Sequence, residues 1–306
     1  MKPISGQSNR IAAFTIVELL TVISIIIILI GILVPGLNMA KRYARRVVQK
    51  NQFHAINVAL EIFNNNWEGY PESSGGFGAV KLCDAVMGND LLGYTPNPED
   101  YNSPETSGRY AYLPRGSANV YKLKCLYNGR YSTRATDYRD SYVLCDVYKR
   151  IEYDNPDDPL HSMNGKKVGM PILYYKADKL GTTHSVKYPI PAPQHDSRVT
   201  PGDIKNIYKH ADNDGLVQLG IPWPHAIPNI VHLMDPSNGT TLYPEKPNLA
   251  TSNVQWFYNE IWNDRITAPG TWRPYNADSY ILMSAGFNGD YGGDRSTGDD
   301  VFNFGD

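Results

Sequence analysis

The longest uninterrupted apolar segment of the chain runs from Phe14 to Val34, and Glu18 is its only ionisable side chain. A helix rises about 1.5 Å per residue, so this stretch spans roughly 30 Å, the thickness of the hydrocarbon core of a bilayer. A carboxylate placed in hydrocarbon is costly, and such a residue usually has a partner and a function. The pattern therefore predicts a membrane-spanning helix with one functional acid near its start.

The apolar pattern changes period beyond Pro35. Apolar side chains then recur every three, four or six residues, a spacing that indicates one face of an amphipathic helix. The positions are Met39, Tyr43, Val47, Phe53, Ile56, Leu60 and Phe63. Pro71 follows soon after, and a proline cannot continue the helical ladder. Residues 14–66 are predicted to form one long helix, which bends or locally melts at Pro35.

Residues 67–306 are predicted to form a head of a different character. Helical periodicity recurs at residues 79–87 and again at 254–262. Short apolar runs separated by turn residues predict strands within a large insertion, residues 95–275. These runs are residues 118–126, 141–147, 170–175 and 216–219. The predicted fold class is α+β, with the long N-terminal helix packed on a small antiparallel sheet that carries an irregular insertion.

Composition narrows the function classes. A net charge of −2 gives no indication of nucleic-acid binding. The seven histidines are scattered, and the chain has no metalloprotease, kinase or Gly-x-Ser-x-Gly pattern, so we predict that it is not an enzyme. The three cysteines are Cys83, Cys125 and Cys145. An oxidising compartment would allow two of them to pair, and the sequence leaves open which two.

The C-terminal end, residues 279–304, concentrates negative charge. An apolar run is followed by a Gly-rich stretch that contains Asp290, Asp294, Asp299 and Asp300, and a short apolar segment comes after it. Ca²⁺ takes six to eight oxygen ligands, and glycines let a loop wrap around the ion. A bound cation would neutralise a loop that otherwise repels itself.

The segment from Ala13 to Glu18, with the apolar run behind it, resembles the N-terminus of type IV prepilins and type II secretion pseudopilins. In that family a prepilin peptidase cuts before a phenylalanine, and a glutamate occupies the fifth position of the mature chain. If Phe14 is the first mature residue, Glu18 is the fifth, and Pro35 stands where members often carry a proline. Ala13 stands where glycine is usual.

The resemblance implies how the protein matures and assembles. Residues 1–13 would be the leader, and Phe14 would become an N-methylated terminus. Its ammonium would pair with Glu18 of a neighbouring copy in a filament of a pilus or a type II secretion system. Before assembly the chain would cross the inner membrane once, with its head in the periplasm or outside the cell. The implied partners are other copies of the chain, the prepilin peptidase and an inner-membrane assembly platform.

The C-terminal end is similar to the calcium loop of major pseudopilins, which commonly reads Ser-Ala-Gly-x-Asp-Gly. This correspondence implies Ca²⁺ as the cofactor. The implied ligands are Asp299 and Asp300, followed by Asn288, Asp290 and Asp294. Asn288 stands where aspartate is usual, and residues 294–298 make the loop longer than the short form of the family.

The charges that follow the apolar run conflict with the topology that the resemblance implies. Basic residues follow the apolar run, and by the positive-inside rule they would keep the head in the cytoplasm. They are Lys41, Arg42, Arg45, Arg46 and Lys50. We follow the resemblance, which implies that the head lies outside the cytoplasm.

Two alternatives for the function remain open. If the resemblance holds, the chain is either a principal subunit of the filament or a minor, tip-located pilin with a binding head. The other alternative is a signal-anchored extracellular enzyme or binding protein that never polymerises.

Overall fold

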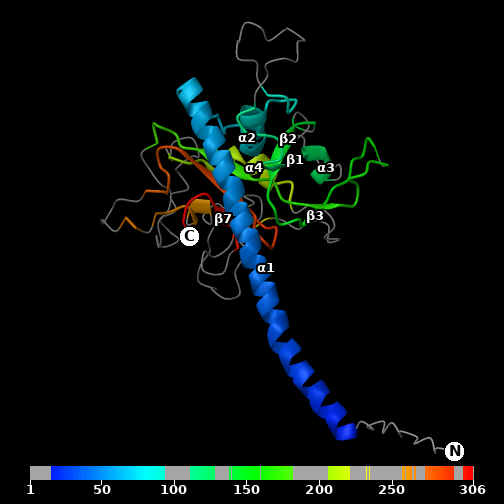
Figure 1. The fold of residues 1–306 in the computed structure, drawn as a ribbon. Coiled ribbons are helices and arrows are strands. Elements are labelled where there is room, and N and C mark those ends of the chain that lie inside the picture. Colours follow the sequence, from blue (N-terminus) through cyan, green and yellow to red (C-terminus); the bar gives the residue numbers. More distant parts are fainter. Residues whose placement is uncertain are drawn as a thin grey trace, which may run out of the picture. The chain divides into compact units, whose positions relative to one another are not determined.

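The computed structural model describes residues 15–93, 111–127, 138, 140–158, 160–181, 206–220, 232, 234, 257–258, 260–263, 265–266, 273–292 and 299–305. Contacts divide the chain into two compact units, Met1–Arg45 and Arg46–Asp306, and the division falls within helix α1 (Ile16–Trp67). The second unit combines helices with small antiparallel sheets, so the fold class is α+β, as predicted (Figure 1).

Helix α1 is unbroken from Ile16 to Trp67, close to the predicted 14–66. Pro35 lies inside it, and the helix continues through that position, so the predicted local melting does not occur. Proline has no N–H, and the carbonyl of Gly31 therefore lacks the donor that a regular helix would supply. Ala13 and Phe14 lie outside the described residues.

Only the second part of the predicted apolar face of α1 is buried. The buried apolar side chains of this helix are Phe53, Ile56, Ala59 and Leu60. Met39, Tyr43 and Val47 are exposed, although the spacing placed them on the same face. Val47 lies six residues before Phe53, a step of about 240° that turns its side chain away from the buried face, whereas Met39 and Tyr43 belong to the first of the two compact units.

Two glutamines fix the buried face of α1 against the head. Gln49 Oε1 accepts a hydrogen bond from the backbone N–H of Val147 at 3.0 Å, and Gln52 Nε2 donates to the carbonyl of Cys145 at 2.8 Å. Both glutamines are buried. They satisfy backbone groups at the end of strand β2 (Tyr142–Cys145), which a purely apolar helix face would leave unpaired.

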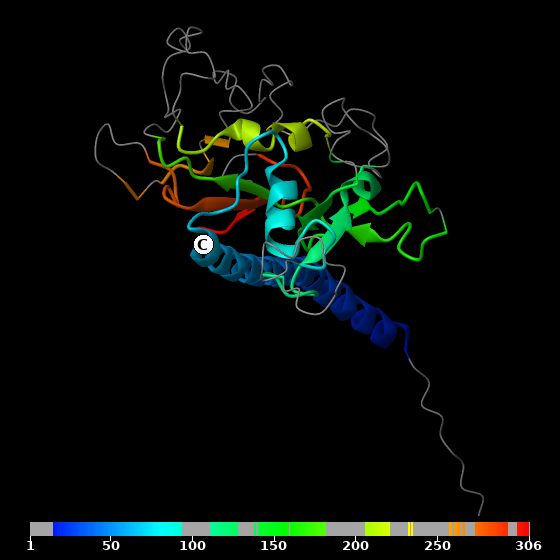
Figure 2. The ribbon, with the colours of Figure 1, turned by 90° about the horizontal axis from the view of Figure 1, so that it is seen from above.

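The central sheet has three antiparallel strands in the order β5 (Leu173–Lys176), β6 (Tyr280–Ser284) and β7 (Val301–Phe302). Its side chains alternate between two apolar clusters, as the period of a strand requires. Tyr174 and Leu282 pack with the buried face of α1. Leu173 and Met283, which are opposite each other in the register, pack with helix α4 (Asp214–Val217). Figure 2 shows α1 and α4 on opposite sides of these strands.

Two smaller sheets extend the head. Strand β1 (Asn119–Lys122) pairs with β2, and β3 (Ile151–Glu152) pairs with β4 (Lys167–Val168), both antiparallel. An isolated bridge between Cys145 and Pro171 connects β2 to the segment that leads into β5.

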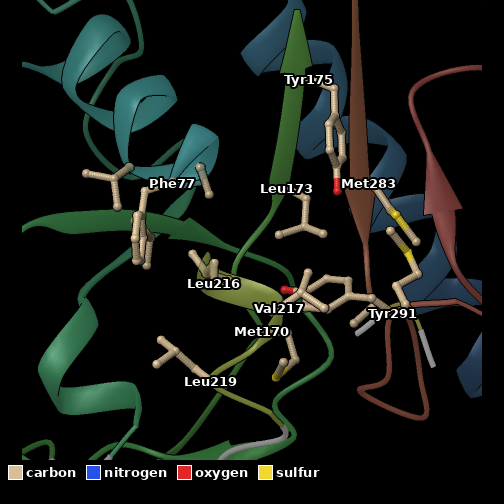
Figure 3. Close-up of a cluster of buried hydrophobic side chains, with 14 of the residues drawn as sticks. Phe77, Met170, Leu173, Tyr175, Leu216, Val217, Leu219, Met283 and Tyr291 are labelled. Atoms are coloured by element: carbon tan, nitrogen blue, oxygen red, sulfur yellow. The ribbon is translucent and has the colours of Figure 1, made fainter. Parts of the chain in front are cut away.

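The turn before α4 joins the insertion to the rest of the head. Asn213 is buried, accepts a hydrogen bond from the N–H of Ala79 at 2.9 Å and donates to the carbonyl of Tyr174 at 2.7 Å. Ala79 belongs to the first turn of helix α2 (Gly78–Met87), so Asn213 caps that helix from a distant part of the chain. Figure 3 shows Leu216 and Val217, which follow this turn, in the core with Phe77 and Tyr291.

The predicted elements are found in part. Helix α2 matches the predicted 79–87, β1 and β2 lie within predicted apolar runs, and β5 extends one residue beyond the run 170–175. Residues 216–219 were predicted as a strand but overlap α4, and Leu123–Leu126 form the short helix α3 instead of continuing β1. Both runs are only a few residues long, and such runs do not distinguish a buried strand from a buried helical turn. A short 3₁₀-helix, η4 (His210–Asp212), precedes α4.

Candidate functional site

The first candidate site is the start of α1, where Glu18 closes the first helical turn. Its Oε2 accepts hydrogen bonds from the backbone N–H of Thr15 at 2.9 Å and from the Thr15 hydroxyl at 2.8 Å. The N–H of Glu18 donates in turn to Thr15 Oγ1 at 3.2 Å. This reciprocal pattern is a capping box, and the Thr-x-x-Glu spacing that signals it is visible in the sequence. Sequence reasoning assigned Glu18 a partner in another subunit and missed this partner within the chain.

The helix behind Glu18 presents apolar side chains outward. From Ile16 to Val34 its large aliphatic side chains are 46% to 82% exposed. An 18-residue window has a mean hydropathy of 3.0 and no buried residue. By length and composition this helix is able to cross a membrane, as an anchor or as a signal sequence.

The second candidate site is the acidic loop, which we define as residues 285–292 together with Asp299 and Asp300. Gly286 has φ of +63°, and a Cβ there would lie 1.9 Å from the carbonyl oxygen of Asp299. A glycine is therefore required where the two halves of the loop meet. Asp299 Oδ2 accepts the N–H of Asn288 at 2.6 Å, and Asp300 Oδ2 accepts the N–H of Gly292 at 2.9 Å. The structure thus brings four of the five predicted ligands into one loop, and Asp294 lies outside the described residues.

Asp300 is the most perturbed acid of this loop. Burial raises its pKa well above the usual range, and the charges of Glu260, Asp290 and Asp299 raise it further. Its Oδ1 is buried and has no hydrogen-bond partner among the described residues. Glu260 is also buried and comes from the insertion, and no local pattern indicates its proximity to the loop. A buried carboxylate oxygen without a donor, among other acids, is the kind of group that a cation would stabilise.

The side chains of the described residues do not by themselves form a complete metal site. Among these residues no three His, Cys, Asp or Glu side chains gather closely enough to hold an ion. Asp299 and Asp300 each use one carboxylate oxygen to bind a backbone amide, and each has a second oxygen. Asn288 Oδ1 accepts the N–H of Asp290 at 2.8 Å. The donor set suits Ca²⁺ in its chemistry, provided that backbone carbonyls or Asp294 complete it.

Arg150 lies against the first turn of the acidic loop. Its Nε donates to the carbonyl of Phe287, and its guanidinium lies over the Phe287 ring at 4.2 Å from the centroid. Burial raises the pKa of Asp299 above its usual value, and backbone N–H groups, such as that of Asn288, and the charge of Arg150 offset only part of this effect. The loop therefore has a cationic side chain at Phe287 and several acids around Asp300.

Asp146 connects the segments around it to the start of the acidic loop through Ser284. Its Oδ1 accepts the N–H groups of Tyr148 at 3.0 Å and Met170 at 3.1 Å, and its Oδ2 accepts the hydroxyl of Ser284 at 2.8 Å. Ser284 Oγ in turn accepts the N–H of Gly286 at 3.2 Å. Burial raises the pKa of Asp146 to about 7. Nothing in the local sequence distinguishes Asp146 from a surface aspartate, because its partners are far away along the chain.

The three cysteines are buried free thiols in this structure. Burial raises the pKa of Cys83 and of Cys145 above the usual range. Such thiols are poor nucleophiles, and a structural role follows for both.

No protein-family model, no curated protein and no solved structure matches this chain. What is established is a long apolar N-terminal helix whose second part packs on a small antiparallel sheet, an arrangement compatible with a pilin-like fold.

Proposed function

We propose that the chain is a structural subunit of a type IV pilus-like or type II secretion filament. The observation that carries the proposal is the exposed apolar helix whose only acid up to Val34 lies in its first turn. Such a helix requires an apolar environment, and both a bilayer and the centre of a helical filament provide one. The head, attached to the second part of the same helix, would face water in either location.

Assembly would depend on charge neutralisation at Glu18. Removal of residues 1–13 would create an ammonium group at Phe14, four residues before the carboxylate. In a filament this ammonium would meet Glu18 of a neighbouring copy in surroundings of low dielectric constant, where the attraction between opposite charges is strong. The capping box described above gives Glu18 a partner while the subunit is alone. In a filament, the ammonium group of the neighbouring copy would either replace Thr15 as the partner of Glu18 or bind Glu18 in addition to Thr15.

Mass spectrometry of the N-terminal peptide tests the maturation step. We expect a methylated peptide that begins at Phe14 when the chain is made with an active prepilin peptidase, and a peptide that begins at Met1 when the peptidase is absent. A chain that still begins at Met1 beside the active enzyme would contradict the proposal. It would favour the signal-anchored alternative, in which the helix is an ordinary anchor.

We also propose that the acidic loop binds Ca²⁺. Asp300 Oδ1, Asp299, Asn288 and Asp290 are the described donors, and Asp294 is a further candidate. The ion would neutralise the acids around Asp300 and hold together the two parts of the loop on either side of residues 293–298. Its role would be to stabilise the head, with no part in a reaction.

Thermal unfolding with and without calcium tests the ion. At a free calcium concentration of ~100 times the Kd, binding stabilises the folded state by ~2.7 kcal/mol, which raises the Tm by roughly 5–10 °C. We expect this increase in the wild-type chain and expect it to vanish in Asp299→Ala. Asp278→Ala serves as the control, because Asp278 is exposed and outside the loop. An equal wild-type Tm in calcium and in chelator would rule out the calcium role.

The minor, tip-located pilin is distinguished by stoichiometry. A principal subunit would account for most of the protein in purified filaments, and a tip subunit for a few copies per filament. Both possibilities share the maturation step, so the peptide measurement does not separate them.

A further inference from the structure

The insertion contacts the acidic loop through a short segment that contains His232 and Met234. His232 is fully buried, and its ring lies 4.7 Å from the ring of Tyr291. The N–H of Met234 donates to the carbonyl of Tyr291 at 3.0 Å, and the N–H of Tyr291 donates to His232 Nδ1 at 3.2 Å when that nitrogen carries no proton. His210, also buried, contacts the carbonyl of Met234 through Nε2 at 2.9 Å. The segment is therefore held in place on both sides of the contact.

Within this contact His232 faces one of the candidate ligands. Its Nδ1 lies 3.0 Å from Asp290 Oδ1. Nδ1 can either donate to Asp290 or accept from Tyr291, and the two bonds exclude each other. An ionised carboxylate only accepts hydrogen bonds, so a bond to Asp290 requires the proton on Nδ1. Nε2 is buried and has no partner among the described residues, which favours that form because a proton on Nε2 would have no acceptor. The side chain of Asp290 is 20% exposed, which means that the histidine reaches it from the protein interior. The carboxylate then has one oxygen directed toward the imidazole, and its orientation is restricted.

We propose that His232 is a positioning residue for Asp290, so that the insertion contributes to the cation affinity of the acidic loop. This inference rests on the proposed binding of calcium. A carboxylate that already has its orientation set by a hydrogen bond loses less freedom when it binds an ion. His232 would act through Asp290 and would not itself touch the ion. Sequence reasoning gave His232 no role, because it lies 58 positions from Asp290.

Two substitutions of similar size separate this role from simple packing. In His232→Asn the amide nitrogen can take the place of Nδ1, whereas in His232→Gln it takes the place of Nε2. Both retain a polar, uncharged side chain in the same cavity. We expect His232→Gln to weaken calcium binding about tenfold and His232→Asn to stay within about twofold of wild type, since removing such an orienting partner typically costs 10–100-fold.

The affinities are measured by isothermal titration of the full chain in detergent with calcium chloride, and folding is checked by the Tm in chelator. Both His232 substitutions are also measured in an Asp290→Asn background. There His232→Gln should cause no further loss of calcium affinity if it acts through the Asp290 carboxylate. A wild-type chain that binds calcium while both variants keep its affinity, or lose it equally, overturns the positioning role and leaves the calcium site standing. A wild-type chain with no calcium binding overturns both.

A second readout needs no substitution and so cannot be lost to misfolding. Calcium should change the nitrogen chemical shifts of the His232 ring in the wild-type chain, because the ion would draw on the same carboxylate that the ring contacts. Unchanged shifts at saturating calcium would overturn the proposal.

Discussion

We expect Glu18→Gln to abolish filament assembly while the chain still inserts into the membrane. Gln accepts and donates hydrogen bonds at this position of a capping box, so the first turn of the helix is retained. What is lost is the charge that would meet the ammonium group of a neighbouring copy. Removing one partner of a buried ion pair costs ~3–5 kcal/mol, and in a filament this penalty recurs at every subunit.

Thr15→Ala is the matched control for this experiment. It removes the hydroxyl that donates to Glu18 and accepts its N–H, at a cost of ~1 kcal/mol, and leaves the carboxylate in place. Filament length and number are counted by electron microscopy at equal subunit levels in the membrane. If Thr15→Ala loses filaments and Glu18→Gln keeps them, the role of Glu18 is to cap the helix, and pairing between subunits is wrong.

The second large effect is expected at Asp146, whose folded-state pKa of about 7 exceeds the usual value of 3.8 for an aspartate. A carboxyl group with a raised pKa favours the folded state most when it is protonated. Its contribution is therefore fully present below pH 3.8 and declines as the pH rises to about 7. For a fully buried group the decline is on the order of a few kcal/mol. We expect Asp146→Asn to remove this part of the pH dependence of the free energy of unfolding.

The comparison requires urea unfolding at several pH values between 4 and 8, with the slope of stability against pH taken for each variant. Asp84 and Asp212 also have pKa values raised to about 6 by burial, so the wild-type slope has several sources. The difference between wild type and Asp146→Asn isolates one of them. Asp158→Asn, at an exposed position, should leave the slope unchanged. Identical slopes for wild type and Asp146→Asn would show that Asp146 is ionised throughout this range.

Local patterns in the sequence were sufficient for the main elements. The apolar run and its continuation predicted α1, and the period of residues 79–87 predicted α2. The strands β1, β2 and β5 follow from β-type apolar runs between turns. The phase of the amphipathic face was wrong between Val47 and Phe53, because a step of six residues does not return to the same side of a helix.

The candidate sites were predictable only where their contacts are local. The ligands of the acidic loop lie within a short stretch, and the pattern of glycines and acids identified it. Asp146 lies 138 positions from Ser284, and no local pattern records such a contact. The same holds for Glu260 and His232, which belong to the insertion and reach the loop only through the fold. The capping box at Thr15 is a local Thr-x-x-Glu pattern, so the sequence was sufficient to predict it, although the prediction for Glu18 named only a partner in another subunit.

The cap that Asn213 provides for α2 has a consequence for the order in which the head forms during synthesis. Ala79 and Asn213 are separated by 134 positions, so α2 leaves the ribosome long before its capping residue exists. Until Asn213 is made, the N–H of Ala79 in the first turn of α2 must bind water, and the carbonyl of Tyr174 lacks the donor that Asn213 supplies. Contacts of such sequence separation form late and slowly. A nascent chain that stops before residue 213 would therefore hold an unfinished α2, and the head would become stable only when its later part is made.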